Sequence, residues 1–366
     1  MFTGDAPRRR TVLKDNARNY RRVHRRVGKS RATFEQVDQG KHGNGSRTVT
    51  LSNRCCGKQN AVTRSSPPIQ KDFRPMRNLI QRSPVAIFIT LTLLAQLGVV
   101  LATWLLIPEG EHMHSDSPGA HLAHAIFRFR VFFPLGLAIL MTWYLDGGEG
   151  LKKLFGSYFH WRVPAKWYAL AFTWKFILGY LGIAIIVWLG MDQWPALVNA
   201  DWKSNLITNA FFIVGIALVE ETSWIRFSVT RMQEKHSSLV SSTVVGMAWG
   251  TWYLMMMLLG EGVPDGIPWY AFMTSMFSLT IFLTWAYNTT RSGTVLLIMQ
   301  VFSNCAFLVA PMLPVPEKPP YFMNAFVVLF LLVSFILIRR FGSADLSKFH
   351  RARWSDPIDQ EPVPKA

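Results

Sequence analysis

Several polar side chains lie inside or beside strongly apolar segments of this chain, where they could carry out chemistry. Glu220 and Glu221 end one such segment, Tyr253 lies inside the next, and Gln300 and Asn304 lie inside a later one. Ionisable groups at membrane depth are costly, so they are functional candidates. Adjacent carboxylates on a helix point about 100° apart, so only one can face a given cavity and activate a water, while the second supports it. The i, i+4 spacing places the two amides on one helix face.

These patterns also have plain structural explanations. Both carboxylates could lie in the polar interface at the inner end of their span, and the two amides could form interhelical hydrogen bonds worth about 1 kcal/mol or less each. Lys175 lies one-third of the way into another apolar segment, and we expect its ammonium to reach the inner interface. The residue types alone therefore leave catalysis and structure open.

A segment between the first two apolar runs combines four histidines with two acids. Imidazole and carboxylate groups are zinc ligands, and histidine also titrates in an acidic medium. The spacings match no standard metal site, so a solvated loop is the better interpretation. The side chains in question are Glu111, His112, His114, Asp116, His121 and His124.

The elements that must position the candidate residues are apolar runs of about 20 residues, the length of a bilayer-spanning helix. We predict an all-α, multi-pass transmembrane helix bundle of about eight spans. With the N-terminus in the cytoplasm, inside segments hold 34 Lys and Arg and outside loops hold 4, as the positive-inside rule requires; the C-terminus is then cytoplasmic too. The predicted spans are Val85–Ile107, Phe127–Leu145, Trp167–Gly190, Leu206–Val219, Leu239–Leu259, Pro268–Tyr287, Thr294–Leu313 and Tyr321–Ile338.

Composition separates a basic arm from this apolar body. The 366 residues are 50% hydrophobic and only 17% charged, yet the net charge is +17. Residues 1–83 hold 20 Lys and Arg against 5 Asp and Glu, which is 20 − 5 = +15 of that charge. Three cysteines are too few for a disulfide-stapled domain, and we interpret them as reduced and non-functional. They are Cys55, Cys56 and Cys305.

The arm has several open explanations. Residues 1–75 are polar and rich in Arg, Ser, Gly and Asn, which predicts a disordered cytoplasmic segment. Its basic residues could contact anionic lipid, each contributing about 1 kcal/mol near the membrane surface. Nucleic-acid binding is a weaker alternative, and a tail that only sets topology is the plainest one. Because Met76 and a short basic stretch precede the first span, residues 1–75 could also lie outside the native protein, which intact-mass spectrometry would test.

Read with their flanks, the polar positions resemble the motifs of the CPBP family, the CAAX-prenyl-protease and bacteriocin-processing (Abi-type) intramembrane metalloproteases. The resemblance covers about residues 155–314. Glu220-Glu221-Thr-Ser-Trp-Ile-Arg226 resembles the family's Glu-Glu-x-x-x-Arg, and Trp249-Gly-Thr-Trp252-Tyr253 its Phe/Trp-x-x-x-His. Thr284-Trp-Ala-Tyr287-Asn288 resembles its Thr-Trp-x-Tyr-Asn turn, and Gln300-Val-Phe-Ser-Asn304 its His-x-x-x-Asn/Asp.

The departures from the family pattern concern the residues that would do the chemistry. Ile225 stands at the arginine position and Arg226 is displaced by one residue, or about 100° around a helix. Tyr253 and Gln300 stand at the two histidine positions. A phenol and an amide offer no imidazole for proton transfer or for zinc, although both can donate hydrogen bonds.

The resemblance implies a CPBP-like core with a degenerate protease site, which binds or protects a membrane-embedded or lipidated peptide or partner. The alternative is an active, atypical intramembrane endopeptidase in which Glu220 is the general base and Tyr253, Gln300 and Asn304 stabilise an oxyanion. We expect no cofactor in the first case and zinc or another divalent metal in the second.

These expectations define the organisation of the protein in a bacterial cytoplasmic membrane. With Glu220 and Glu221 at an inner span end, the cavity should open to the cytoplasm. The chain is divided into the arm (1–83), the first two spans with the histidine-containing loop (84–150), the CPBP-like core (151–340) and a cytoplasmic tail (341–366).

Overall fold

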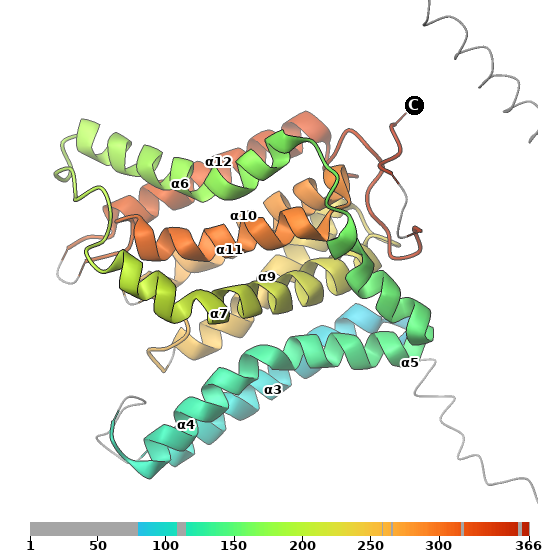
Figure 1. Cartoon of the computed structure of the whole chain (residues 1–366), viewed down its shortest axis with the longest axis horizontal. Coiled ribbons are helices and arrows are strands. Elements are labelled where there is room, and N and C mark those ends of the chain that lie inside the picture. Colours follow the sequence, from blue (N-terminus) through green and yellow to red (C-terminus); the bar gives the residue numbers. More distant parts are fainter. Residues whose placement is uncertain are drawn as a thin grey trace, which may run out of the picture. The chain divides into compact units, whose positions relative to one another are not determined.

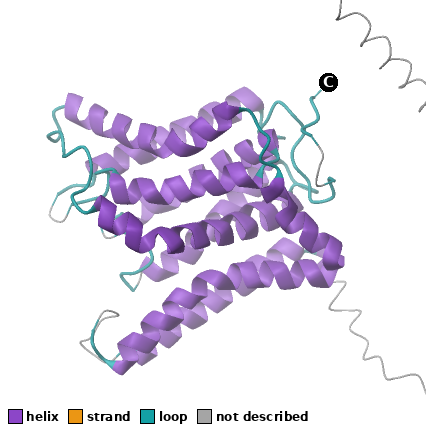
Figure 2. Ribbon diagram, in the orientation of Figure 1, coloured by secondary structure: helices purple, strands orange, loops and turns teal. Residues whose placement is uncertain are grey.

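Helices dominate the computed structural model, which describes residues 80–107, 115–257, 259–264, 266–315, 318–357 and 361–365. Within these ranges there is no strand, only an isolated bridge between Phe349 and Pro364 (Figure 2). The all-α prediction is therefore confirmed for the described residues. The predictions for the basic arm, for Cys55 and Cys56, and for Glu111, His112 and His114 lie outside them.

Proline and serine residues begin several of the helices. α3 and α4 each have proline at the first position, where its missing N–H is no loss, and Ser117 caps α4 by accepting a hydrogen bond from the Ala120 amide at 3.2 Å. α4 continues through a 3-10 turn into α5, which breaks its helical geometry at Gly147 with a φ of 65°. The elements of this part are α3 (Pro84–Leu106), α4 (Pro118–Phe129), η1 (Arg130–Phe132), α5 (Phe133–Gly156) and η2 (Ser157–Phe159).

The remaining helices form the rest of the bundle. One of them is interrupted by a π-helical stretch, η3, in which the backbone is wound more widely than in an α-helix. The elements are α6 (Ala165–Trp188), α7 (Trp202–Glu220), η3 (Glu221–Val229), α8 (Thr230–Met232), α9 (Ser238–Met257), α10 (Trp269–Thr290), α11 (Gly293–Val309) and α12 (Tyr321–Phe341).

Five helical stretches among the described residues are long and apolar enough to cross a membrane. The other predicted spans coincide with α9, α10 and the shorter apolar helix α11, so each predicted span falls on a helix while the count of eight stays a prediction. The five stretches are Pro84–Leu106, Pro118–Phe159, Ala165–Trp188, Trp202–Met232 and Tyr321–Phe341.

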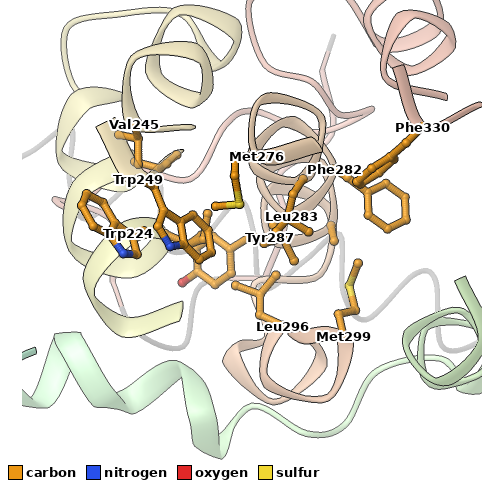
Figure 3. Packing of buried hydrophobic residues seen from close by; sticks show 14 of the residues in the cluster. Trp224, Val245, Trp249, Met276, Phe282, Leu283, Tyr287, Leu296, Met299 and Phe330 are labelled. Atoms are coloured by element: carbon orange, nitrogen blue, oxygen red, sulfur yellow. The ribbon is translucent and has the colours of Figure 1, made fainter. Parts of the chain in front are cut away.

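The helices pack side by side around an aromatic core. α6 lies beside α11 and α12, α9 beside α10, and α3 runs along the α4–α5 pair (Figure 1). In the core, Trp224 stacks on Trp249 with ring centroids 5.9 Å apart (Figure 3). All described residues belong to one compact unit, and the division into sections 84–150, 151–340 and 341–366 stays a prediction.

The segment after α12 covers one end of the bundle. Asn288 of α10 donates hydrogen bonds to Gln233 Oε1 (2.9 Å), Ser238 Oγ (3.0 Å) and the Asp345 carbonyl oxygen (2.8 Å). Its own Oδ1 accepts from the Ala352 amide at 2.9 Å and from Gln233 Nε2 at 3.2 Å. The predicted tail is thus packed against the helices by a buried amide network, which we call the Asn288 network.

Candidate functional site

Glu220 is the last residue of α7 and lies inside the bundle with 3% of its surface exposed. Its Oε1 accepts a hydrogen bond from the Tyr253 hydroxyl at 2.6 Å, and its Oε2 accepts one from Gln300 Nε2 at 2.8 Å. The donors come from α9 and α11, so three helices meet at one carboxyl group. The structure brings together residues that are 33 and 80 positions apart in the sequence.

A cavity of about 130 Å³ adjoins this carboxyl group. Glu220, Tyr253, Gln300 and Asn304 all line it, so four of the six predicted site residues share one space. The other walls are mainly aromatic and apolar, which is typical of a small-ligand site with a few polar groups. They include Trp174, Trp249, Phe272, Phe307, Phe326 and Phe330.

The depth of the cavity differs from the sequence-based expectation. Glu220 is not at the end of its helical stretch, which runs on through η3 and α8 to Met232. The cavity is lined instead by Gly262, Val263 and Ile267 of the α9–α10 connection. That connection follows the C-terminal end of α9, whereas the segment after α12 contacts its first residue, Ser238. The helix therefore does not end at Glu220 and Glu221 as expected, and the side of the membrane to which the cavity opens stays a prediction.

Lys175 is a functional candidate that the sequence placed elsewhere. Its ammonium does not extend to an interface: the side chain is buried, lines the cavity, donates a hydrogen bond to Ser303 Oγ at 3.0 Å and lies over the Phe307 ring. The expectation that it reaches the inner interface was wrong because α6 turns this face toward α11. One feature of the sequence could have indicated this position: Ser303, the partner of Lys175, lies three residues after Gln300 and hence on the same helix face.

Glu221 does not line the cavity. It begins η3, is fully buried, and neither of its carboxyl oxygens has a hydrogen-bond partner among the described residues. Next to it, Thr222 and Tyr158 share a hydrogen bond of 2.8 Å between their hydroxyl groups. Of the adjacent carboxylates only the first faces the cavity, as the 100° offset on a helix requires.

Arg226 also lies outside the cavity. Its guanidinium donates to the Tyr287 hydroxyl and to the Lys153 carbonyl oxygen, the latter at 2.5 Å, so it joins η3 to α10 and α5. Ile225, at the family's arginine position, is buried in the hydrophobic core. In this geometry Arg226 positions η3 and has no contact with the cavity.

The donor atoms around Glu220 do not fit zinc. The cavity offers one carboxylate, a phenol and two primary amides, whereas catalytic zinc takes three ligands drawn from His, Cys and carboxylate side chains. No group of three or more His, Cys, Asp and Glu side chains lies together among the described residues. His121 is 4.0 Å from Asp116 at the start of α4, and Cys305 is half-buried with a free thiol.

Comparisons with models of protein families and with curated proteins find no match. The resemblance to the CPBP family therefore remains a prediction from the quoted motifs.

Proposed function

We propose that this protein is a multi-pass membrane protein whose central cavity binds a membrane-embedded or lipidated peptide without cleaving it, as a CPBP-like pseudo-protease. The observation that supports it is the pair of hydrogen bonds from Tyr253 and Gln300 to the two oxygens of Glu220. These are the side chains at the family's histidine positions. Neither a phenol nor an amide takes up a proton near neutral pH, so neither can relay one from Glu220 to a leaving amine.

The walls of the cavity favour a peptide that carries an apolar group. Aromatic and aliphatic side chains surround it, while Asn304, Ser275 and Lys175 supply polar atoms that a peptide backbone or carboxylate could bind. At about 130 Å³ the cavity is smaller than sites that enclose a whole small ligand, so its apolar walls would hold one hydrophobic side chain or the end of a lipid chain, and the polar atoms would fix its orientation.

For the membrane arrangement we propose eight spans with both termini in the cytoplasm of a bacterial cell. The support is that every predicted span coincides with a helix and that basic residues concentrate in alternate connections. The α9–α10 connection and the cavity that it lines then face the other side of the membrane.

The second candidate is hydrolysis by an atypical intramembrane endopeptidase. It is favoured by one observation, a carboxyl group in a cavity that also contains the amides of Gln300 and Asn304. Each carboxylate oxygen has a further lone pair, so Glu220 could still accept a proton from a water while Asn304 donates to an oxyanion.

One experiment separates the two candidates. The purified full chain in neutral detergent is mixed with a fluorescent farnesylated peptide blocked at both ends; anisotropy reports binding and mass spectrometry reports cleavage. We expect saturable binding and an intact peptide. Ser275→Phe, which fills the cavity, should weaken binding at least tenfold, and Thr274→Phe, at the neighbouring position that does not line it, should not.

Cleavage that disappears in Glu220→Gln would establish the hydrolase and contradict the binding-only function. Absence of both binding and cleavage would contradict both candidates. Equal binding by the two phenylalanine variants would show that the peptide binds elsewhere.

A further inference from the structure

A second cavity lies among α3, α4, η1 and α9 and shares no lining residue with the cavity at Glu220. Its volume is about 490 Å³, within the usual range of small-ligand sites of roughly 300–1,000 Å³. Most of its lining is apolar, with two polar exceptions that come from different helical segments, Gln96 of α3 and Arg130 of η1. The apolar lining consists of Ala95, Val99, Leu122, Ala125, Ile126, Phe129, Phe133 and Trp252.

Both polar side chains are buried with unused hydrogen-bonding atoms. Gln96 is 1% exposed, and neither its Nε2 nor its Oε1 has a partner among the described residues. Arg130 is 5% exposed, and its Nε and Nη1 also lack partners there. An unsatisfied buried polar group costs about 1–3 kcal/mol, and more when it is charged. Such groups converging on one cavity indicate that a ligand supplies the missing partners.

The guanidinium is held in place by its surroundings. It lies 4.2 Å from the ring centroid of Phe127 and 4.7 Å from that of Trp252, both at cation–π distance. On another side it approaches Gly262, where an added Cβ would come within 3.0 Å of Nη2. The aromatic rings and the nearby carboxylates of Glu220 and Glu261 compensate part of the charge, but none of them accepts a hydrogen bond from Nε or Nη1.

The chemistry of the ligand follows from these contacts. A guanidinium only donates hydrogen bonds, so the ligand must present acceptors, and a negative charge best compensates a buried cation. The Gln96 amide can donate to the same group. At the rim, Leu122, Phe129 and Phe133 are 52%, 75% and 43% exposed, so an apolar chain leaving the cavity would meet a surface that a membrane solvates.

We propose that this cavity binds the anionic head of an amphiphile, a carboxylate or phosphate on an apolar chain, between Arg130 and Gln96. This proposal does not rest on the function proposed for the Glu220 cavity. Water alone could also satisfy the unpaired atoms of Arg130 and Gln96, so the test must distinguish a bound amphiphile from a cavity that holds only water.

The test uses the purified full chain in neutral detergent with radiolabelled laurate as the probe. We expect saturable binding of one laurate per chain. Arg130→Met should weaken it at least tenfold, whereas Arg128→Met, the same substitution at an exposed position two residues earlier, should leave it unchanged. Dodecanol, which has the chain without the charge, should compete at least tenfold less well than unlabelled laurate.

Gln96→Leu keeps the test decisive if Arg130→Met does not fold. This substitution replaces a neutral amide by an apolar side chain of similar size, and it should weaken laurate binding several-fold. Competition by dodecyl phosphate alone would assign the site to single-chain anions, and competition by phosphatidylglycerol would assign it to a phospholipid head; either supports an anion on an apolar chain.

Three results would overturn the proposal. They are no saturable laurate binding, laurate binding that Gln96→Leu and Arg130→Met leave unchanged, and competition by dodecanol equal to that by laurate. The first would leave water as the content of the cavity, and the last would show an apolar pocket without charge recognition.

Discussion

Two buried polar regions of the bundle differ in how their hydrogen bonds are completed. In the Asn288 network, both the amide nitrogen and the amide oxygen of Asn288 are bonded to protein atoms, including backbone atoms of the segment after α12. Around Glu220, the carboxylate is bonded by two side chains, but Gln300 Oε1 has no partner among the described residues and a cavity adjoins. A saturated network stabilises the fold, whereas an incomplete one beside a cavity leaves atoms for a ligand.

The largest expected effect is in the saturated region. Asn288→Leu removes five hydrogen bonds and leaves the Asp345 carbonyl oxygen and the Ala352 amide buried without partners, whereas Gln233 and Ser238 keep the bond between them. At about 1–3 kcal/mol for each unsatisfied group, we expect a loss of at least about 2 kcal/mol in the free energy of unfolding. Thermal or denaturant unfolding in mild detergent would measure it.

The matched control for that variant is Asn209→Leu on α7. The Asn209 side chain donates only to the carbonyl oxygen of Asn205, one turn earlier on an exposed face. Its substitution should change the unfolding free energy by about 0.5 kcal/mol or less. Equal losses for the two variants would mean that the Asn288 network contributes no more than an ordinary surface bond.

A smaller effect is expected from acid in the same region. Burial raises the pKa of the Asp345 carboxyl, but the Arg351 amide at 3.1 Å and the charges of Lys365 and Arg351 lower it further, so its net pKa lies below the ordinary value. Because the pKa of Asp345 is lower in the folded than in the unfolded protein, its carboxylate stabilises the folded state at pH values above the unfolded-state pKa. This stabilisation is lost as the pH falls through the folded-state pKa.

We therefore expect the amide hydrogens of the segment after α12 to lose protection, measured against the intrinsic exchange rate at the same pH, once the pH falls below the ordinary range of an aspartate. Hydrogen exchange followed by mass spectrometry would report it, with an effect of about 1 kcal/mol or less, as for other partly exposed ion pairs. Asp345→Asn should remove the pH dependence. If the dependence persisted in that variant, another carboxylate would be responsible.

The smallest effect on stability is expected at Glu220. In Glu220→Gln the Tyr253 hydroxyl still donates to the new amide oxygen, and Gln300 can turn its unpaired Oε1 toward the new amide nitrogen. Both contacts are thereby retained without the buried charge, so we expect a change below about 1 kcal/mol in unfolding free energy. A loss as large as that of Asn288→Leu would remove the distinction between the two regions.

The sequence was informative where one helix carries the signal. Apolar length placed a helix at every predicted span, and the i, i+4 rule placed Gln300 and Asn304 on one face, which lines the cavity. The ends of helices were harder to predict. Two acidic residues after an apolar run, Glu220 and Glu221, are typical of the end of a membrane-spanning helix. The helix nevertheless continues, because the residues of η3 that follow are buried against other helices.

Residues whose roles depend on packing between helices could not be placed from the sequence. Lys175 was expected near an interface because a charge usually reaches water when its stem allows, and nothing in the sequence indicates that Arg130 is buried either. Their burial depends on partners far along the chain, Ser303 for the first and Trp252 for the second. Asn288 belongs to a motif noted in the sequence, but its partners in the segment after α12 carry no local pattern.

The Asn288 network has a consequence for how the protein is made. Ala352, whose amide bonds to Asn288, is 64 residues further along the chain. At about 5–20 residues per second, the ribosome adds it roughly 3–13 s after Asn288. During that interval the nascent bundle has helices in place but an open polar end, which water, the insertion machinery or a chaperone must cover. The final tightening of this bundle is therefore a late event of its biosynthesis, timed by translation.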